Sequence, residues 1–216
     1  MTSSPGGFVG ESLTELAKAA AQFHMTHEPE ADRLWRDGLR LTMEILDPLN
    51  GMNAVEPPLA AKVALIITTV QSLQCSHSLA LQGYFLQAAN LLRAPVEYIV
   101  AAHYLQFRPS EYVGFTEDKV PTPKFETMKK HVRQGLRDLV GKKQAANFDE
   151  QIQQIYKELN PFSHVDKDCL RLVMKQGERG LTILVGPDED ANLYAAWAGR
   201  AAFLLSLLIL TLVWTK

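Results

Sequence analysis

The stretch from Leu79 to Phe107 constrains the fold more than any other part of the chain. It reads LALQGYFLQAANLLRAPVEYIVAAHYLQF, which predicts a helix that is apolar around most of its circumference. A helix of this kind normally lies at the centre of a bundle. Polar side chains interrupt it along one narrow stripe, at about 100° per residue: Gln82, Asn90, Arg93 and Glu97. This stripe is expected to face a partner, a cleft or a strip of solvent.

Amphipathic patterns and helix-stop signals predict the remaining helices. They are expected at 11–25, 30–46, from 59 through to 107, 124–140 and 145–159, with a last one after Pro187. Pro95 lies inside the long pattern, so a kink or a break is predicted near Arg93.

Two short β-type runs near the C-terminal end predict a hairpin. They are 169–174 and 181–185, and the segment KQGERG separates them. The first ten residues are rich in Gly and Ser and are expected to form a disordered leader. The chain is therefore predicted to be mainly α: a single helical bundle over 11–216, with its core in 59–214 and one small β-hairpin near residues 169–186.

Charge and composition narrow the function classes. The chain has 22 Lys and Arg against 24 Asp and Glu, so there is no overall basic excess, and any nucleic-acid site must be a local patch. Its start lacks the basic and apolar segments of a secretion signal, which favours the cytoplasm. The run Ala201–Trp214 is apolar but shorter than the roughly 20 residues of a membrane span. A buried last helix or a dimer seam is favoured over a tail anchor.

Arg93 and Glu97 are the first candidate site residues, because their i, i+4 spacing lets the side chains meet on a helix surface. A structural ion pair is the favoured interpretation, and a ligand or catalytic cleft is the alternative. His164 follows a predicted helix end and is flanked by Ser163 and Asp166, which suits proton transfer at neutral pH. A histidine that only bonds the backbone of the turn is the competing interpretation. The hydroxyl of Tyr156 is a further candidate for the same cleft.

The segment 124–143 is locally basic. Lys130, Arg133 and Arg137 share one predicted helix face, which suits phosphate binding, although a solvated face is the commoner case. His24 and His27 are spaced i, i+3, but no carboxylate–histidine repeat on another helix accompanies them. Nucleotide-loop, serine-hydrolase and zinc-protease motifs are absent from the sequence. No metal and no cofactor are therefore predicted.

In chain order, several of these features resemble a known group of proteins. The first is the helix with Leu91-Leu-Arg93-Ala-Pro-Val-Glu97, which leads into Tyr104-Leu105. A helix carrying Lys129–Leu139 follows, and after it come Tyr156, Leu159 and Ser163-His164. The last features are a hairpin and an apolar final helix. Over about Leu59–Trp214 the chain resembles helical bacterial proteins of unknown function near the HEPN domains and the abortive-infection proteins of phage defence. The resemblance implies a helical module that binds RNA or a protein partner and forms homo-oligomers.

The HEPN ribonucleases separate a catalytic arginine from a histidine by four to six residues. At the matching positions before His164 this chain has Leu159, Glu158 and Lys157, so the arginine is missing. Lysine lacks the planar bidentate contact of a guanidinium, and Arg93 would have to replace it from another helix. Non-catalytic binding through Asn90, Arg93, Glu97, His164 and the basic helix is therefore the leading functional prediction. A metal-independent ribonuclease that uses His164 and Arg93 is the alternative, and a tail-anchored membrane protein is the third.

Overall fold

The computed structural model describes residues 8–49, 56–160, 174–177, 180–183 and 190–213. Its long helices are α1 (Phe8–His27), α2 (Pro29–Leu46), α3 (Pro57–Leu81), α4 (Phe85–Phe107), α6 (Phe125–Val140), α7 (Lys142–Leu159) and α9 (Ala191–Val213). Shorter elements are η1 (Asp47–Leu49), η2 (Pro109–Tyr112) and α5 (Val113–Thr116). The predicted mainly α class is confirmed.

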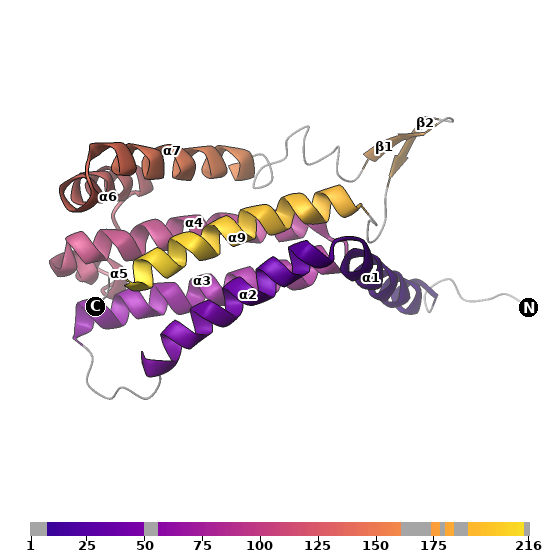
Figure 1. Ribbon diagram of the computed structural model, residues 1–216, viewed down its shortest axis with the longest axis horizontal. Coiled ribbons are helices and arrows are strands. Elements are labelled where there is room, and N and C mark those ends of the chain that lie inside the picture. Colours follow the sequence, from indigo (N-terminus) through magenta and orange to yellow (C-terminus); the bar gives the residue numbers. More distant parts are fainter. Residues whose placement is uncertain (1–7, 50–55, 161–173, 178–179, 184–189, 214–216) are drawn as a thin grey trace, which may run out of the picture.

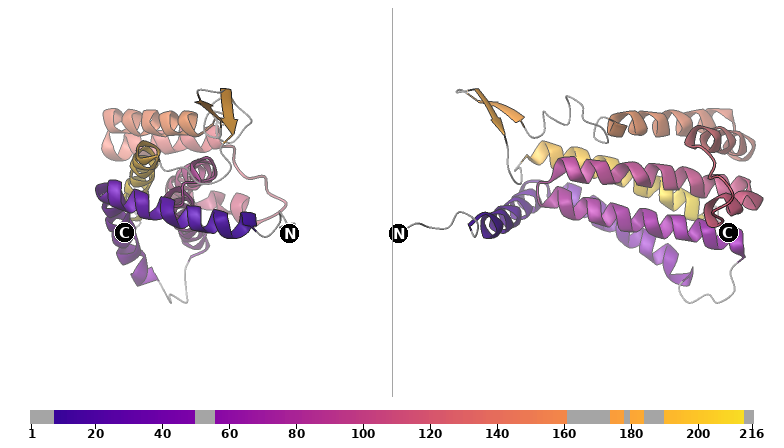
Figure 2. Two further views of the ribbon diagram at one scale, coloured as in Figure 1. Left: turned by 90° about the vertical axis from the view of Figure 1, so that its right-hand side faces the viewer. Right: turned by 180° about the vertical axis from the view of Figure 1, so that it is seen from behind.

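The long helices lie in three tiers (Figure 1). The α6–α7 pair covers one side of α4 and α9, and α2 and α3 lie on their other side, as the end-on and rear views also show (Figure 2). Helix α1 crosses one end of the bundle. Since α4 packs against α3, α6, α7 and α9, it occupies the central position that its apolar circumference predicts.

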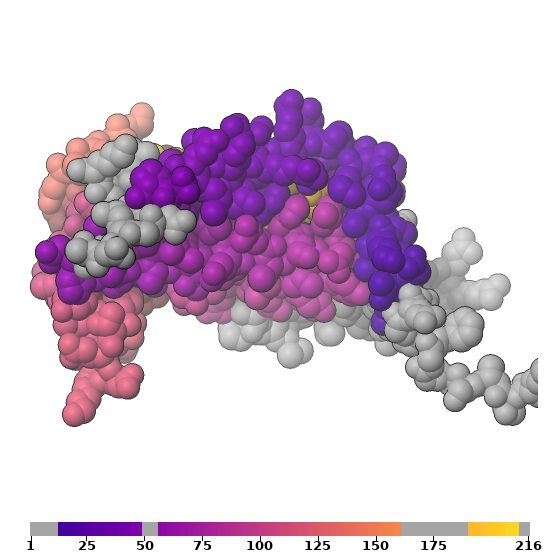
Figure 3. Space-filling model, turned by 90° about the horizontal axis from the view of Figure 1, so that it is seen from below, coloured from indigo at the N-terminus to yellow at the C-terminus, as the bar shows by residue number. Residues whose placement is uncertain are grey.

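The core is continuous through these tiers. Every residue of α4 from Ile99 to Leu105 is buried, and α9 contributes Leu204 and Leu208 to the same cluster. Seen from below, α2 and the α3–α4 hairpin cover most of α9, and a small part of α9 is visible between them (Figure 3). Full burial of a leucine side chain contributes about 1.5–3 kcal/mol, so this interior dominates the stability of the fold.

The predicted continuous helix from 59 to 107 is wrong, because the chain reverses direction at Gln82–Tyr84. Gly83 has a φ of +81°, its N–H donates to the carbonyl of Ala80 at 3.0 Å, and Tyr84 N–H donates to Leu79 at 2.8 Å. These two bonds form a Schellman motif, which requires the left-handed conformation that glycine adopts without strain. Gln82 therefore does not share the stripe of α4, and α4 itself runs without a break through Pro95.

Helix α9 packs mainly on α2 and α4, which agrees with the favoured interpretation of the apolar run as a core helix. By length and composition alone, α3 and the segment Ala191–Thr211 are each long and apolar enough to cross a membrane. Core helices of globular bundles pass the same test.

Strands β1 (Met174–Gly177) and β2 (Gly180–Ile183) pair antiparallel, with Met174 opposite Ile183 and Gly177 opposite Gly180. This pairing includes Lys175, Gln176 and Gly177, which belong to the segment KQGERG that was predicted to be the turn. The first expected strand covers 169–174, and only Met174 of it belongs to the described residues. At the other end of the chain, α1 begins at Phe8, within the expected leader.

Candidate functional site

Of the four candidate residues for a catalytic cleft, Arg93, Glu97 and Tyr156 meet between α4 and α7. Arg93 donates from Nη2 to the Tyr156 hydroxyl at 2.8 Å, and that hydroxyl donates to Glu97 Oε1 at 3.2 Å. Arg93 Nε lies 3.5 Å from the same carboxylate oxygen. The side chains of Arg93 and Glu97 are 26% and 41% exposed, so this ion pair lies at the surface and contributes little by itself.

The aromatic ring of Tyr156 joins this cluster to α6. It stacks on Phe125 with 4.6 Å between ring centroids, and the Arg93 guanidinium lies 5.0 Å from the Tyr156 ring centroid. Cation–π contacts of this kind contribute about 0.5–1 kcal/mol at exposed sites. Because Arg93 is already engaged by a hydroxyl, a carboxylate and a ring, the arrangement favours the structural interpretation of the Arg93–Glu97 pair.

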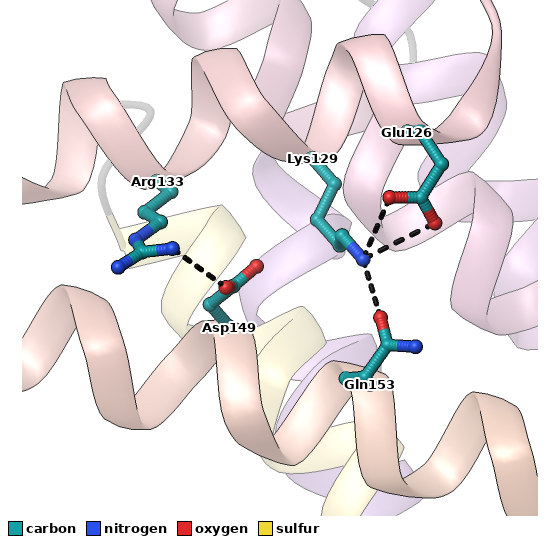
Figure 4. A network of polar contacts seen from close by, with 5 residues as sticks. All are labelled: Glu126, Lys129, Arg133, Asp149 and Gln153. Carbon is teal, nitrogen blue, oxygen red and sulfur yellow. Dashed lines mark hydrogen bonds and ion pairs between the residues drawn. The ribbon is translucent and has the colours of Figure 1, made fainter.

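A line of polar contacts continues from this cluster along the α6–α7 hairpin (Figure 4). Lys129 donates to Gln153 and contacts Glu126 at 2.9 Å, and Arg133 Nη1 lies 3.3 Å from Asp149 Oδ2. Lys129 and Arg133, four positions apart on α6, thus face Gln153 and Asp149, four positions apart on α7 and in reverse order, as expected for two antiparallel helices. This seam holds the two helices in register.

The seam leads to a basic hollow near the turn at Gly141. Its volume is about 260 Å³, and it is lined by Lys130, Arg133, Gln134, Arg137, Lys142 and Ala145. All three predicted phosphate-binding cations therefore line one concavity, and Lys142 from the start of α7 adds a fourth. Among the residues that the structure describes, Lys130, Arg137 and Lys142 have no carboxylate partner. Unpaired cations gathered in this way create a local positive potential.

The structure does not test the predicted pairing of Arg93 with His164, because residues 161–173 lie outside the described part of the chain. Asn90 is exposed on α4, three residues before Arg93. Tyr156 and Ala145 are eleven positions apart on α7, which corresponds to about 16 Å along a helix. The Arg93 cluster and the basic hollow therefore occupy opposite ends of the hairpin.

His24 and His27 do not form a shared site. His24 is fully buried and stacks on Tyr194 at 5.1 Å, whereas His27 is exposed and its Nδ1 lies 2.9 Å from the Phe23 carbonyl. In the described part of the chain, no three side chains drawn from His, Cys, Asp and Glu lie together in one cluster.

A buried polar cluster lies between α2, α3 and α9 and was not predicted from the sequence. Asp32, His77 and Tyr194 meet there, and Trp35 and Trp197 pack around the imidazole. Burial lowers the pKa of His77, and the Asp32 carboxylate opposes that shift. Burial also raises the pKa of Tyr194, and Asp32 adds to it. Residues so far apart in sequence share no local pattern that would have pointed to them.

Comparison with protein-family models, curated proteins and solved structures finds no match to this chain. A functional assignment therefore depends on the geometry and charge of the surfaces just described.

Proposed function

We propose that this protein binds RNA, and that the phosphate groups of the RNA contact the basic hollow of the α6–α7 hairpin. The observation that carries the proposal is the convergence of Lys130, Arg133, Arg137 and Lys142 around one concavity in a chain whose formal net charge is -2. A general excess of positive charge does not explain such a patch.

The partners of these cations support binding of an external anion. Arg133 has a carboxylate neighbour in Asp149, but its own side chain is 58% exposed and has further donors to offer. Arginine matches phosphate with two parallel N–H groups, and lysine adds compact point charges around it. Each phosphate neutralised in this way releases condensed counterions, which drives RNA binding at low salt.

The direct test measures the affinity for a short fluorescein-labelled single-stranded RNA by anisotropy over a series of salt concentrations. We expect log K to fall linearly with log salt, by about 0.7 for each phosphate contacted. Arg137→Gln and Lys142→Gln should each weaken binding and reduce that slope by about one contact.

Lys18→Gln is the matched control, because Lys18 is also an exposed lysine but lies on α1 beside Glu15. It should leave both affinity and slope unchanged. Two results would rule the hollow out as the RNA site and favour the predicted protein partner. One is a wild-type affinity that does not change with salt. The other is an affinity that is the same in Arg137→Gln, Lys142→Gln and Lys18→Gln.

The ribonuclease alternative is separable in the same samples. Arg93 directs its donors at Tyr156 and Glu97, which weakens its candidacy as a phosphate ligand, and the role of His164 stays a prediction. Cleavage of the labelled RNA in EDTA, lost in His164→Ala with the fold intact, would establish the enzyme. We expect the RNA to remain intact in all of these samples.

The resemblance to HEPN-associated proteins, homo-oligomerisation and a cytoplasmic location are likewise predictions that accompany this proposal.

A further inference from the structure

The polar atoms of the buried cluster between α2, α3 and α9 form a nearly equilateral triangle. His77 Nε2 lies 3.3 Å from Tyr194 Oη and 3.5 Å from Asp32 Oδ1, and the last two oxygens are 3.5 Å apart. Hydrogen bonds normally measure about 2.5–3.0 Å between two oxygens and about 2.7–3.2 Å between nitrogen and oxygen. The oxygen–oxygen side of the triangle is therefore longer than a well-formed hydrogen bond, and the two sides that end on His77 Nε2 also exceed the normal range.

These separations match the edge of a metal coordination tetrahedron. Zn²⁺ binds imidazole nitrogen and carboxylate oxygen at about 2.0–2.2 Å, which places ligand atoms about 3.4 Å apart in a tetrahedron. We propose that Asp32 Oδ1, His77 Nε2 and Tyr194 Oη bind a Zn²⁺ ion. Three protein ligands leave a fourth position for water or another small ligand, as in catalytic rather than structural zinc sites.

The donor set favours zinc over the common hard cations. Mg²⁺ and Ca²⁺ prefer six or more oxygen ligands, whereas an imidazole nitrogen with two oxygens suits a borderline ion. Coordination by Tyr194 releases its phenolic proton to the solvent, so the bound ligand set carries two negative charges and neutralises Zn²⁺.

Neighbouring side chains hold two of the ligands in place. Arg36 Nε lies 2.7 Å from Asp32 Oδ2, which turns the other carboxylate oxygen toward His77. Trp35 stacks on the imidazole with 4.9 Å between ring centroids. Outer contacts of this kind orient metal ligands and are a regular part of zinc sites. The Arg36 charge opposes a cation, but its side chain is 65% exposed and the charge is therefore screened.

Trp197 completes the wall around the cluster. Its indole N–H donates to the Ser76 hydroxyl at 2.7 Å, and that hydroxyl donates to the Ala88 carbonyl at 2.8 Å. These bonds fix Trp197 beside His77, at 5.3 Å between ring centroids. The site is enclosed but not sealed, because the His77 side chain is 17% exposed and the Asp32 side chain 11%.

The test uses the full-length protein after dialysis against EDTA, titrated with Zn²⁺ in competition with a chromophoric zinc indicator. We expect one equivalent to bind. Tyr194→Phe keeps the ring but removes the ligand oxygen, and His77→Gln removes the nitrogen. Each should weaken Zn²⁺ binding at least about tenfold, since even outer-sphere changes cost that much. His27→Gln, which alters an exposed histidine on α1, is the control and should bind as the wild type does.

A second measurement on the wild type does not depend on whether a variant folds. Zn²⁺ should produce the ultraviolet difference band of tyrosinate, because Tyr194 loses its proton on coordination. No zinc binding, binding without this band, or equal binding by folded Tyr194→Phe would each overturn the proposal and leave the three residues as a hydrogen-bonded cluster.

Discussion

At the scale of single residues, the Tyr156 hydroxyl is the centre of the polar cluster between α4 and α7. It accepts a hydrogen bond from Arg93 and donates one to Glu97, while its ring stacks on Phe125. The hydroxyl and the ring therefore make separable contributions. A substitution that deletes only the oxygen isolates the polar one.

We expect Tyr156→Phe to lower the free energy of unfolding by about 1 kcal/mol, because two partly exposed hydrogen bonds are lost and the ring stays. Urea denaturation measures the change. Tyr98→Phe is the control, since among the described residues the Tyr98 hydroxyl has no hydrogen-bond partner, and it should be neutral. Equal losses in the two variants would show that the Tyr156 hydroxyl contributes nothing specific.

We expect His103 to make the free energy of unfolding depend on pH. Burial lowers its pKa to about 3, and the positive charge of Lys62 adds to the shift. An unfolded chain binds a proton at this imidazole near pH 6.5. Between those values the unfolded state holds more protons, so the free energy of unfolding falls as the pH decreases, by about 1.4 kcal/mol per pH unit for this one group.

Replacement of that imidazole tests the sign and the size of the effect. Urea denaturation of His103→Gln between pH 6.5 and 4.5 should show a slope flatter than the wild type by about that amount. The exposed His27 is the comparison, and His27→Gln should keep the wild-type slope. Parallel pH profiles for wild type and His103→Gln would mean that the buried imidazole does not control this loss of stability.

At the scale of the elements, two glycines in helix interiors have opposite surroundings. A Cβ at Gly135 on α6 would lie 2.3 Å from Cγ of Phe107, at the end of α4. A Cβ at Gly199 on α9 would have nothing within 4 Å. The first glycine allows α6 to approach α4 closely, and the second only lowers helix propensity.

Gly135→Ala should therefore destabilise the protein by about 1–3 kcal/mol, because Phe107 or the whole helix must move. Gly199→Ala should stabilise it by up to about 1 kcal/mol through helix propensity. Thermal unfolding followed by circular dichroism compares the two. An increase in stability in both variants would show that there is room for a Cβ between α6 and Phe107.

At the scale of the whole molecule, α9 is the helix whose environment is most informative. Ala201, Leu204 and Leu208 are fully buried against the rest of the bundle, so insertion into a bilayer would require α9 to leave α2 and α4. That exchange forfeits the packing of the core and gains little, since lipid is no more apolar than the interior it would replace.

The protein should accordingly stay in the supernatant without detergent and should not float with phosphatidylcholine vesicles in a density gradient. Analytical ultracentrifugation of the same protein at several protein concentrations tests the predicted homo-oligomer. Flotation with neutral vesicles would contradict the packing of α9 and support the tail anchor.

Much of the helical framework was predictable because its signals are local. The expected helix 124–140 differs by one residue from α6, since Lys124 is extended and Gly141, at φ +93°, ends the helix. The break at Gly83 was missed because the apolar pattern continues on both sides of it. One glycine can end a helix there only if the two halves then pack together, which the pattern does not reveal.

Sequence alone determined the mainly helical class, the positions of most helices, the central role of the Arg93 helix and the shared face of Lys130, Arg133 and Arg137. Only the tertiary structure decided which distant groups meet: Arg93 with Tyr156, 63 positions apart, and Asp32 with Tyr194, 162 apart. Periodicity and capping act over a few residues, whereas these contacts between distant residues depend on how the helices pack around one core.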